Sequence, residues 1–145
     1  MAGADPVLAR RAALVAICEP AANGVIDRVV DEAVHAAGRF GLTRERAHAY
    51  TAGIKDTLPR AFEAMKMPDG LERSAHIDAL AQAVRGVSDA HHIPRIVERG
   101  LVVIAVRIAR EVIRRRAAEH GFTPDELEKE FVSFADQLED RLSRM

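Results

Sequence analysis

Apolar residues recur along this chain three or four positions apart, the spacing of one helix face, in six segments. The segments cover residues 5–17, 21–37, 43–66, 71–90, 94–118 and 123–145. No run alternates apolar and polar residues between hairpin turns, so no strand is predicted. The pattern therefore predicts an all-α fold, with residues 1–145 forming a single domain built as one bundle of about six helices.

Prolines and capping residues mark the ends of these segments. Pro6 follows a cap residue, as proline does in the first turn of a helix, and Pro20 separates the first two segments. Pro59 lies inside the third segment and is expected to kink or split it. Thr123 and Glu126 have the spacing of a capping box at the start of the sixth segment.

The fourth segment carries an apolar stripe that ends in a histidine. Its members share one helix face and are Ile77, Leu80, Val84, Val87 and His91. Such a histidine, just before a turn, could ligate haem iron, with His92 as a substitute and Tyr50 as an aromatic hydroxyl on the opposite side. A core or turn histidine bonded to a backbone carbonyl is the favoured interpretation, because one histidine specifies little. We therefore expect no cofactor, with haem as the alternative.

The last two segments differ in how their apolar residues are arranged. Residues 101–106 are apolar on every side, which predicts a central buried helix. The final segment carries a stripe close to a coiled-coil seam. We expect four of its residues to contact a second subunit in a homodimer, although in a monomer they would fill the interior: Phe131, Phe134, Leu138 and Leu142.

Charge excludes some partners and leaves others open. The net charge is −1, so no overall field favours nucleic acid or an acidic membrane. The basic cluster Arg110–Arg116 lacks interleaved aromatic residues, and the sixth segment is acidic. Antiparallel packing of the last two helices would pair these charges. We favour ion pairing, and nucleic-acid binding through the Arg110–Arg116 cluster is the alternative.

No catalytic signature accompanies these patterns. The chain has no Gly-rich phosphate loop, no nucleophile elbow and a single cysteine, Cys18, which fits a reducing cytoplasm. Two Glu-x-x-His pairs, at 32–35 and 45–48, sit on polar helix faces, so no metal site is expected. Gly100 is expected to allow a close helix contact. No run is long enough to span a membrane, and we expect a cytoplasmic protein that is not an enzyme.

The order of features resembles a family of helical sensor domains. The matching segments are 26–37, 50–58, Leu-Ala-Gln-Ala-Val-Arg at 80–85, 100–116 and Gly-Phe-Thr-Pro-Asp-Glu-Leu at 121–127. Together they resemble the N-terminal domains of stressosome co-antagonists and of PucR-like transcription regulators. Residues 90–108 are similar to globin-coupled sensors, although Pro94 stands where those sensors often have glycine.

The resemblance implies a globin-like fold without haem, dimerisation and a role in signal transduction. We therefore expect a regulatory domain that passes a ligand or partner signal through its last helix to an effector. The alternatives are a haem-binding gas sensor that uses His91, and a nucleic-acid-binding regulator.

Overall fold

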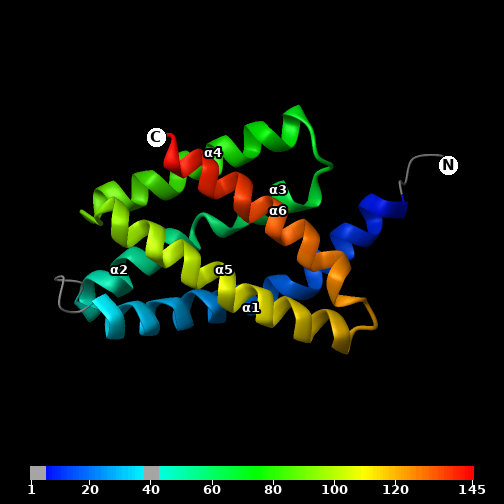
Figure 1. Ribbon diagram of the computed structural model, residues 1–145, viewed down its shortest axis with the longest axis horizontal. Coiled ribbons are helices and arrows are strands. Elements are labelled where there is room, and N and C mark those ends of the chain that lie inside the picture. The colour runs from blue at the N-terminus through cyan, green and yellow to red at the C-terminus, as the bar shows by residue number, and fades with distance from the viewer. Residues whose placement is uncertain (1–5, 38–42) are drawn as a thin grey trace.

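The computed structural model describes residues 6–37 and 43–145, without the side chains of residues 36, 37 and 124–127. Within these ranges every regular element is helical, which confirms the all-α prediction. The helices are α1 (Pro6–Ala37), α2 (Arg44–Lys55), α3 (Leu58–Lys66), α4 (Leu71–Ala90), α5 (Arg95–Glu119) and α6 (Pro124–Ser143) (Figure 1). No helix in the described residues combines the length and apolarity needed to cross a bilayer.

Two prolines have opposite outcomes. Pro20 was expected to separate two helices, but α1 continues through it and changes direction along its length (Figure 1). Both halves of α1 bury apolar residues, Leu14 on one side of the proline and Val29 on the other, and this packing offsets the lost backbone hydrogen bond. Pro59 acts as predicted, because α2 ends at Lys55 and α3 begins beside this proline.

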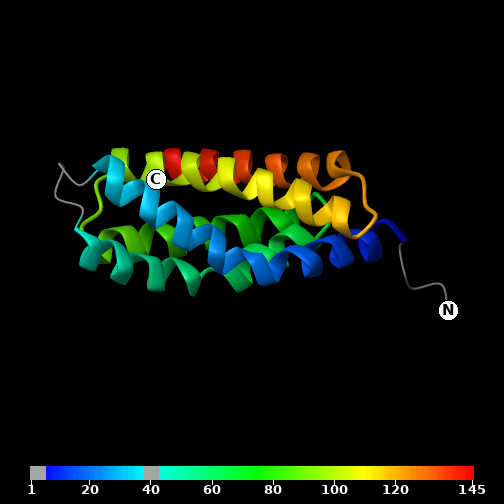
Figure 2. The ribbon, with the colours of Figure 1, turned by 90° about the horizontal axis from the view of Figure 1, so that it is seen from below.

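The helices form two layers. Figure 2 shows α5 and α6 in one layer and α2, α3 and α4 in the other, with α1 crossing between them. From the turn at residues 91–94, α4 and α5 diverge, and α6 runs back between them in Figure 1 and packs against both. The C-terminal end of α6 therefore lies close to the turn that joins α4 to α5.

The core draws on every helix, and α5 is not its centre. Ile77, Leu80 and Val84 of the predicted stripe are buried, as expected. The prediction of a central buried helix at 101–106 is wrong, since Val103 is 56% exposed. One side of α5 packs against α1 and α6 while the other faces solvent, so an apolar run here does not mean burial on all sides.

Glycine supports a close helix contact at a different position from the one expected. A Cβ atom at Gly100 would meet nothing within 4 Å, so this glycine does not mediate a helix contact. At Gly53 in α2 a Cβ atom would lie 2.6 Å from Cγ1 of Val87 in α4. The absence of a side chain at Gly53 is what lets α2 approach α4 here.

The start of α6 also differs from prediction. Thr123 is its N-cap and Pro124 follows, as the sequence indicated, but the Thr123 side chain makes no capping hydrogen bond. Thr43 does cap α2, with its Oγ1 accepting from the backbone N–H of Arg46 at 3.2 Å.

Candidate functional site: a cavity in the helical core

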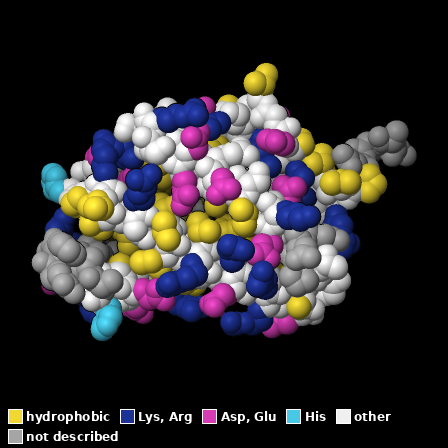
Figure 3. All heavy atoms as spheres, viewed as in Figure 1, with side chains coloured by type: hydrophobic (Ala, Val, Ile, Leu, Met, Phe, Trp, Pro, Cys, Tyr) yellow, Lys and Arg dark blue, Asp and Glu magenta, His cyan; other side chains and the backbone are white. Residues whose placement is uncertain are grey.

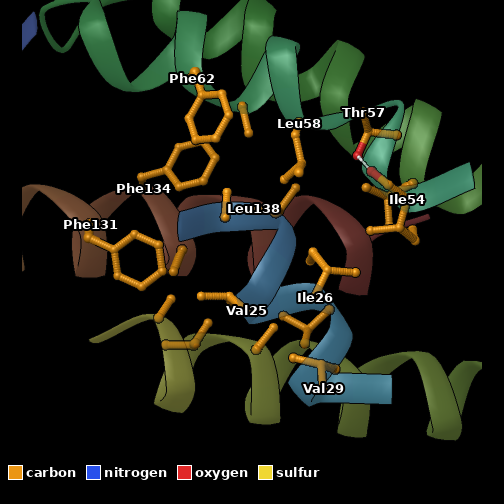
Figure 4. Close-up of a pocket in the computed structure, with 18 of the residues that line it drawn as sticks. Val25, Ile26, Val29, Ile54, Thr57, Leu58, Phe62, Phe131, Phe134 and Leu138 are labelled. Carbon is orange, nitrogen blue, oxygen red and sulfur yellow. Dashed lines mark hydrogen bonds between the residues drawn. The ribbon is translucent and has the colours of Figure 1, made fainter. Parts of the chain in front are cut away.

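A cavity of about 240 Å³ lies in the core, and all six helices contribute to its wall (Figure 4). None of the lining residues carries a charge. Figure 4 shows Phe62 of α3 and Phe134 of α6 pointing toward each other at one end, with Phe131 nearby. Branched aliphatic residues of α1, Val25, Ile26 and Val29, line the opposite part (Figure 4).

Small side chains explain why this space is left open. The wall contains alanines from four helices where larger residues would close the core: Ala22, Ala61, Ala105, Ala109 and Ala135. Aromatic residues make up only 4% of the chain, so few large side chains are present to fill the centre. Apolar cavities of about 150 Å³ already stay dry and accept small apolar molecules. The arrangement is therefore suited to a small apolar ligand.

The hydroxyl groups on the wall are bonded to the protein itself. Tyr50 and Ser88 share a hydrogen bond of 2.9 Å between their side-chain oxygens. Thr51 Oγ1 donates to the carbonyl of Ala47 at 2.6 Å, and Thr57 Oγ1 donates to the carbonyl of Ile54 at 2.6 Å. These bonds satisfy the hydroxyl groups of the wall within the protein.

Burial raises the pKa of the two titratable groups of the wall, Tyr50 and Cys18. Burial raises the pKa of Tyr50 to about 12, with the Ser88 hydrogen bond acting in the opposite direction and the Glu98 carboxylate adding to the rise. Burial also raises the pKa of the Cys18 thiol, against the attraction of the Arg116 charge. A protonated thiol is a poor nucleophile, so Cys18 is not activated for nucleophilic chemistry.

A buried ion pair joins three helices at the end of α6. Arg85 of α4 donates from Nη2 to Oε1 of Glu98 in α5 at 2.9 Å, and the two side chains are 8% and 4% exposed. The same nitrogen donates to the carbonyl of Leu142 at 2.8 Å, and Nη1 donates to the carbonyl of Met145 at 3.1 Å. Arg85 thus closes the last turn of α6, where helix carbonyls have no intrahelical partner.

Sequence reasoning missed this pair because it treats Arg and Glu as surface residues. A signal was present. Arg73, Ile77, Ala81, Arg85 and Ser88 follow the helical spacing of a buried face, and all five are buried. An arginine inside such a stripe indicates a buried partner on another helix.

The two histidines considered as alternative haem ligands, His91 and His92, end a helix. His91 is the C-cap of α4, and His92 has a φ of 55°, the left-handed conformation common after a helix. The N–H of Ile93 bonds the carbonyl of Ser88 at 2.8 Å, and that of His92 bonds the carbonyl of Asp89 at 3.2 Å. These two bonds form a Schellman motif.

The described residues do not fit haem between His91 and Tyr50. The two rings meet edge-on, with centroids 6.3 Å apart and an interplanar angle of 76°. Direct contact leaves no room for a macrocycle between a proximal and a distal residue. Tyr50 belongs to the cavity wall, whereas neither His91 nor His92 does.

The residues expected at a dimer contact lie in the core of this chain. Phe134 and Leu142 are 5% and 6% exposed, and Phe131 and Leu138 are half-buried against the same cluster. The stripe faces inward because α6 fills the space between α4 and α5. The prediction that these four residues contact a second subunit is therefore wrong for this stripe, because they fill the interior of the chain itself.

The basic cluster pairs with acidic groups and carbonyls, as favoured from the sequence. Glu128 of α6 accepts from Nε of Arg114 at 2.9 Å and from Nε of Arg110 at 3.0 Å, and these bonds lower its pKa. Arg116 donates to the carbonyl of Ile17 in α1 at 2.8 Å. Arg115 is exposed. The cluster thus serves largely to hold α5 against α1 and α6.

The Glu-x-x-His pairs do not assemble a ligand set. Glu32 pairs with Arg107 of α5, while His35, Glu45 and His48 are exposed. Across residues 6–37 and 43–145, where side chains are described, no three His, Cys, Asp or Glu residues come together as metal ligands would.

Comparison of the chain with family models, curated proteins and solved structures finds no match. The cavity and the contacts around it are therefore the features that indicate a function.

Proposed function

We propose that this chain is a non-catalytic regulatory domain of the cytoplasm, in which a small molecule in the core cavity biases the position of α6. One observation carries the proposal: α6 supplies Phe131, Phe134 and Leu138 to the wall of an apolar cavity (Figure 4). The resemblance to stressosome and PucR-like sensor domains supports it, and a globin-like arrangement is part of the proposal.

The contacts of α6 suggest how filling the cavity would be transmitted. Its middle forms part of the cavity wall, so an occupant adds contacts to Phe134 and Leu138. Its end is held by Arg85 through the carbonyl of Leu142. Near its start α6 is held through Glu128, and between these two ends it borders open space. An occupant of that space shifts the balance between positions of α6 through its preference for one of them.

A homodimer and an effector contact complete the proposal. The α6 stripe is buried and is not the surface through which we propose that two copies of the chain meet. Instead, α5 exposes two large apolar residues, Ile96 at 82% and Val103 at 56%. Hydrophobic side chains gather among charged ones on the face that Figure 3 shows. Light scattering tests this part, since a monomer at every concentration would overturn the dimer and leave the role of the cavity intact.

Filling the cavity from within tests the coupling without knowledge of the ligand. Ala105 lies on the wall in α5, and Ala105→Leu adds about three methylene-sized groups to the open space. At about 0.8 kcal/mol per buried group, less the cost of ordering the side chain, we expect a gain of about 1 to 2 kcal/mol. Ala118→Leu is the matched control, because Ala118 is exposed on the same helix.

Hydrogen exchange measured by mass spectrometry provides the readout. We expect amides of α6 to exchange roughly tenfold more slowly in Ala105→Leu than in Ala118→Leu, since 1.4 kcal/mol corresponds to about a factor of ten. Slowing confined to α5, with α6 unchanged, would show that the cavity and α6 are not coupled and would overturn the proposal.

A further inference from the structure

We infer that the cavity takes an uncharged, hydrocarbon-like molecule of about ten non-hydrogen atoms that needs no polar recognition. The inference rests on the proposed function, which it deepens by naming the class of ligand. Three observations carry it: the bonding of the wall hydroxyls, the absence of charge on the wall, and the volume of the cavity.

The hydroxyl donors of the described lining residues are already used within the protein. The hydroxyls of Tyr50, Thr51 and Thr57 each have a partner within the protein, at 2.9, 2.6 and 2.6 Å. Cys18 is held as a thiol, a weak donor. A site that recognises a polar ligand keeps convergent polar groups for it, and among the described lining residues the hydroxyl donors are already used within the protein.

Charged partners for an ionised ligand also lie off the wall. Among the described residues, Arg73 is the one buried side chain with nitrogens that have no hydrogen-bond partner. Arg73 does not line the cavity. Arg85 faces Glu98 and the carbonyl of Leu142 instead. A carboxylate in this cavity would therefore be buried without a counter-charge, which is strongly unfavourable.

The volume sets the size of the ligand. A dry cavity of about 150 Å³ accommodates benzene, which has six carbon atoms. The present cavity of about 240 Å³ is larger by a factor of roughly 1.6, so by proportion it holds about ten non-hydrogen atoms. The aromatic end formed by Phe62, Phe131 and Phe134 and the aliphatic part opposite suit a ring that carries a short chain (Figure 4).

Three probes that differ only in one substituent test the inference on the intact chain. They are butylbenzene, which has about ten carbon atoms as the cavity requires, and its polar relatives 4-butylphenol and 4-butylbenzoate. We measure binding by titration calorimetry and the shift of the thermal unfolding midpoint at equal free concentrations. Butylbenzene should bind once per chain, the phenol at least about tenfold more weakly because its hydroxyl leaves water for an apolar wall, and the benzoate should cause no shift.

Variants locate the binding and separate this inference from the proposed function. Ala105→Leu should reduce the affinity for butylbenzene at least about tenfold by occupying the space, while Ala118→Leu should leave it unchanged. If the benzoate binds as tightly as butylbenzene or more tightly, the proposed ligand class is wrong. If Ala105→Leu leaves the affinity for butylbenzene unchanged, butylbenzene binds outside the cavity and the inference fails. If no probe binds, the inference fails, while the exchange of α6 amides in Ala105→Leu judges the proposed function independently.

Discussion

Replacing Arg85 by methionine should destabilise the fold far more than the loss of a surface ion pair. The change keeps an unbranched apolar stem but leaves the Glu98 carboxylate, 4% exposed, without its cation. It also removes the donor that lies 2.8 Å from the carbonyl of Leu142 at the end of α6. Removing one partner of a buried ion pair costs about 3 to 5 kcal/mol, a large part of the roughly 5 to 15 kcal/mol that holds a domain together.

The assay is urea unfolding followed by circular dichroism at neutral pH. We expect the free energy of unfolding to fall by about 4 kcal/mol in Arg85→Met. Arg144→Met makes the same chemical change at a pair whose side chains are 70% and 43% exposed, and its cost should be below about 0.5 kcal/mol.

A double variant separates the stranded charge from the lost packing. Arg85→Met combined with Glu98→Leu leaves no buried charge at this position, so most of the loss should be recovered and about 1 kcal/mol should remain for the carbonyl of Leu142. A single variant that costs less than about 1 kcal/mol would refute this account of the ion pair. A double variant as unstable as Arg85→Met would show that packing, not charge, sets the loss.

Three further outcomes follow from the structure. Tyr50 is the single tyrosine of a chain without tryptophan, so phenolate absorbance should give a midpoint near 12 in the folded protein and about 10 in denaturant. Because the folded pKa is raised, the contribution of Tyr50 to stability is lost as the pH rises between these two values. Equal midpoints would contradict the burial of Tyr50. Glu128 has a lowered pKa, so the free energy of unfolding should fall as the pH drops below about 4.5. Urea unfolding should show a weaker pH dependence in Glu128→Gln, and an unchanged dependence would show that other groups cause it. Gly53→Ala should lower the stability measured by thermal unfolding by about 1 to 3 kcal/mol, because the new Cβ atom would meet Val87. Gly100→Ala should raise it by about 0.5 to 1 kcal/mol, and equal effects of the two variants would contradict the close contact at Gly53.

The helices were predictable because helical periodicity is a local property. Residues three and four apart face the same way whatever packs on them, so the stripe Ile77, Leu80 and Val84 could be recognised without a partner. The predictions that were wrong concern positions where tertiary contacts, and not the local sequence, decide the structure. Pro20 stays within α1 because both of its flanks are packed, and Val103 is exposed although its neighbours in sequence are apolar.

The cavity could not be predicted because it depends on volumes contributed by six helices at once. Ala105 and Ala135 lie on different helices, and nothing in either local pattern says that both face the same unfilled space. The role of His91 was open for a similar reason. Its spacing matched the stripe, yet only the backbone bonds at residues 91–93 show that it ends a helix.

The order of apolar and polar residues thus determined that this chain is helical, where most helices begin and end, and that charges on α5 and α6 would pair. Tertiary structure alone decided which stripe faces inward, which glycine allows a close approach and where an empty space remains. The physical reason is range. Backbone hydrogen bonding and side-chain direction act over one helical turn, whereas a cavity and a buried pair such as Arg85 and Glu98 require groups from separate helices to meet.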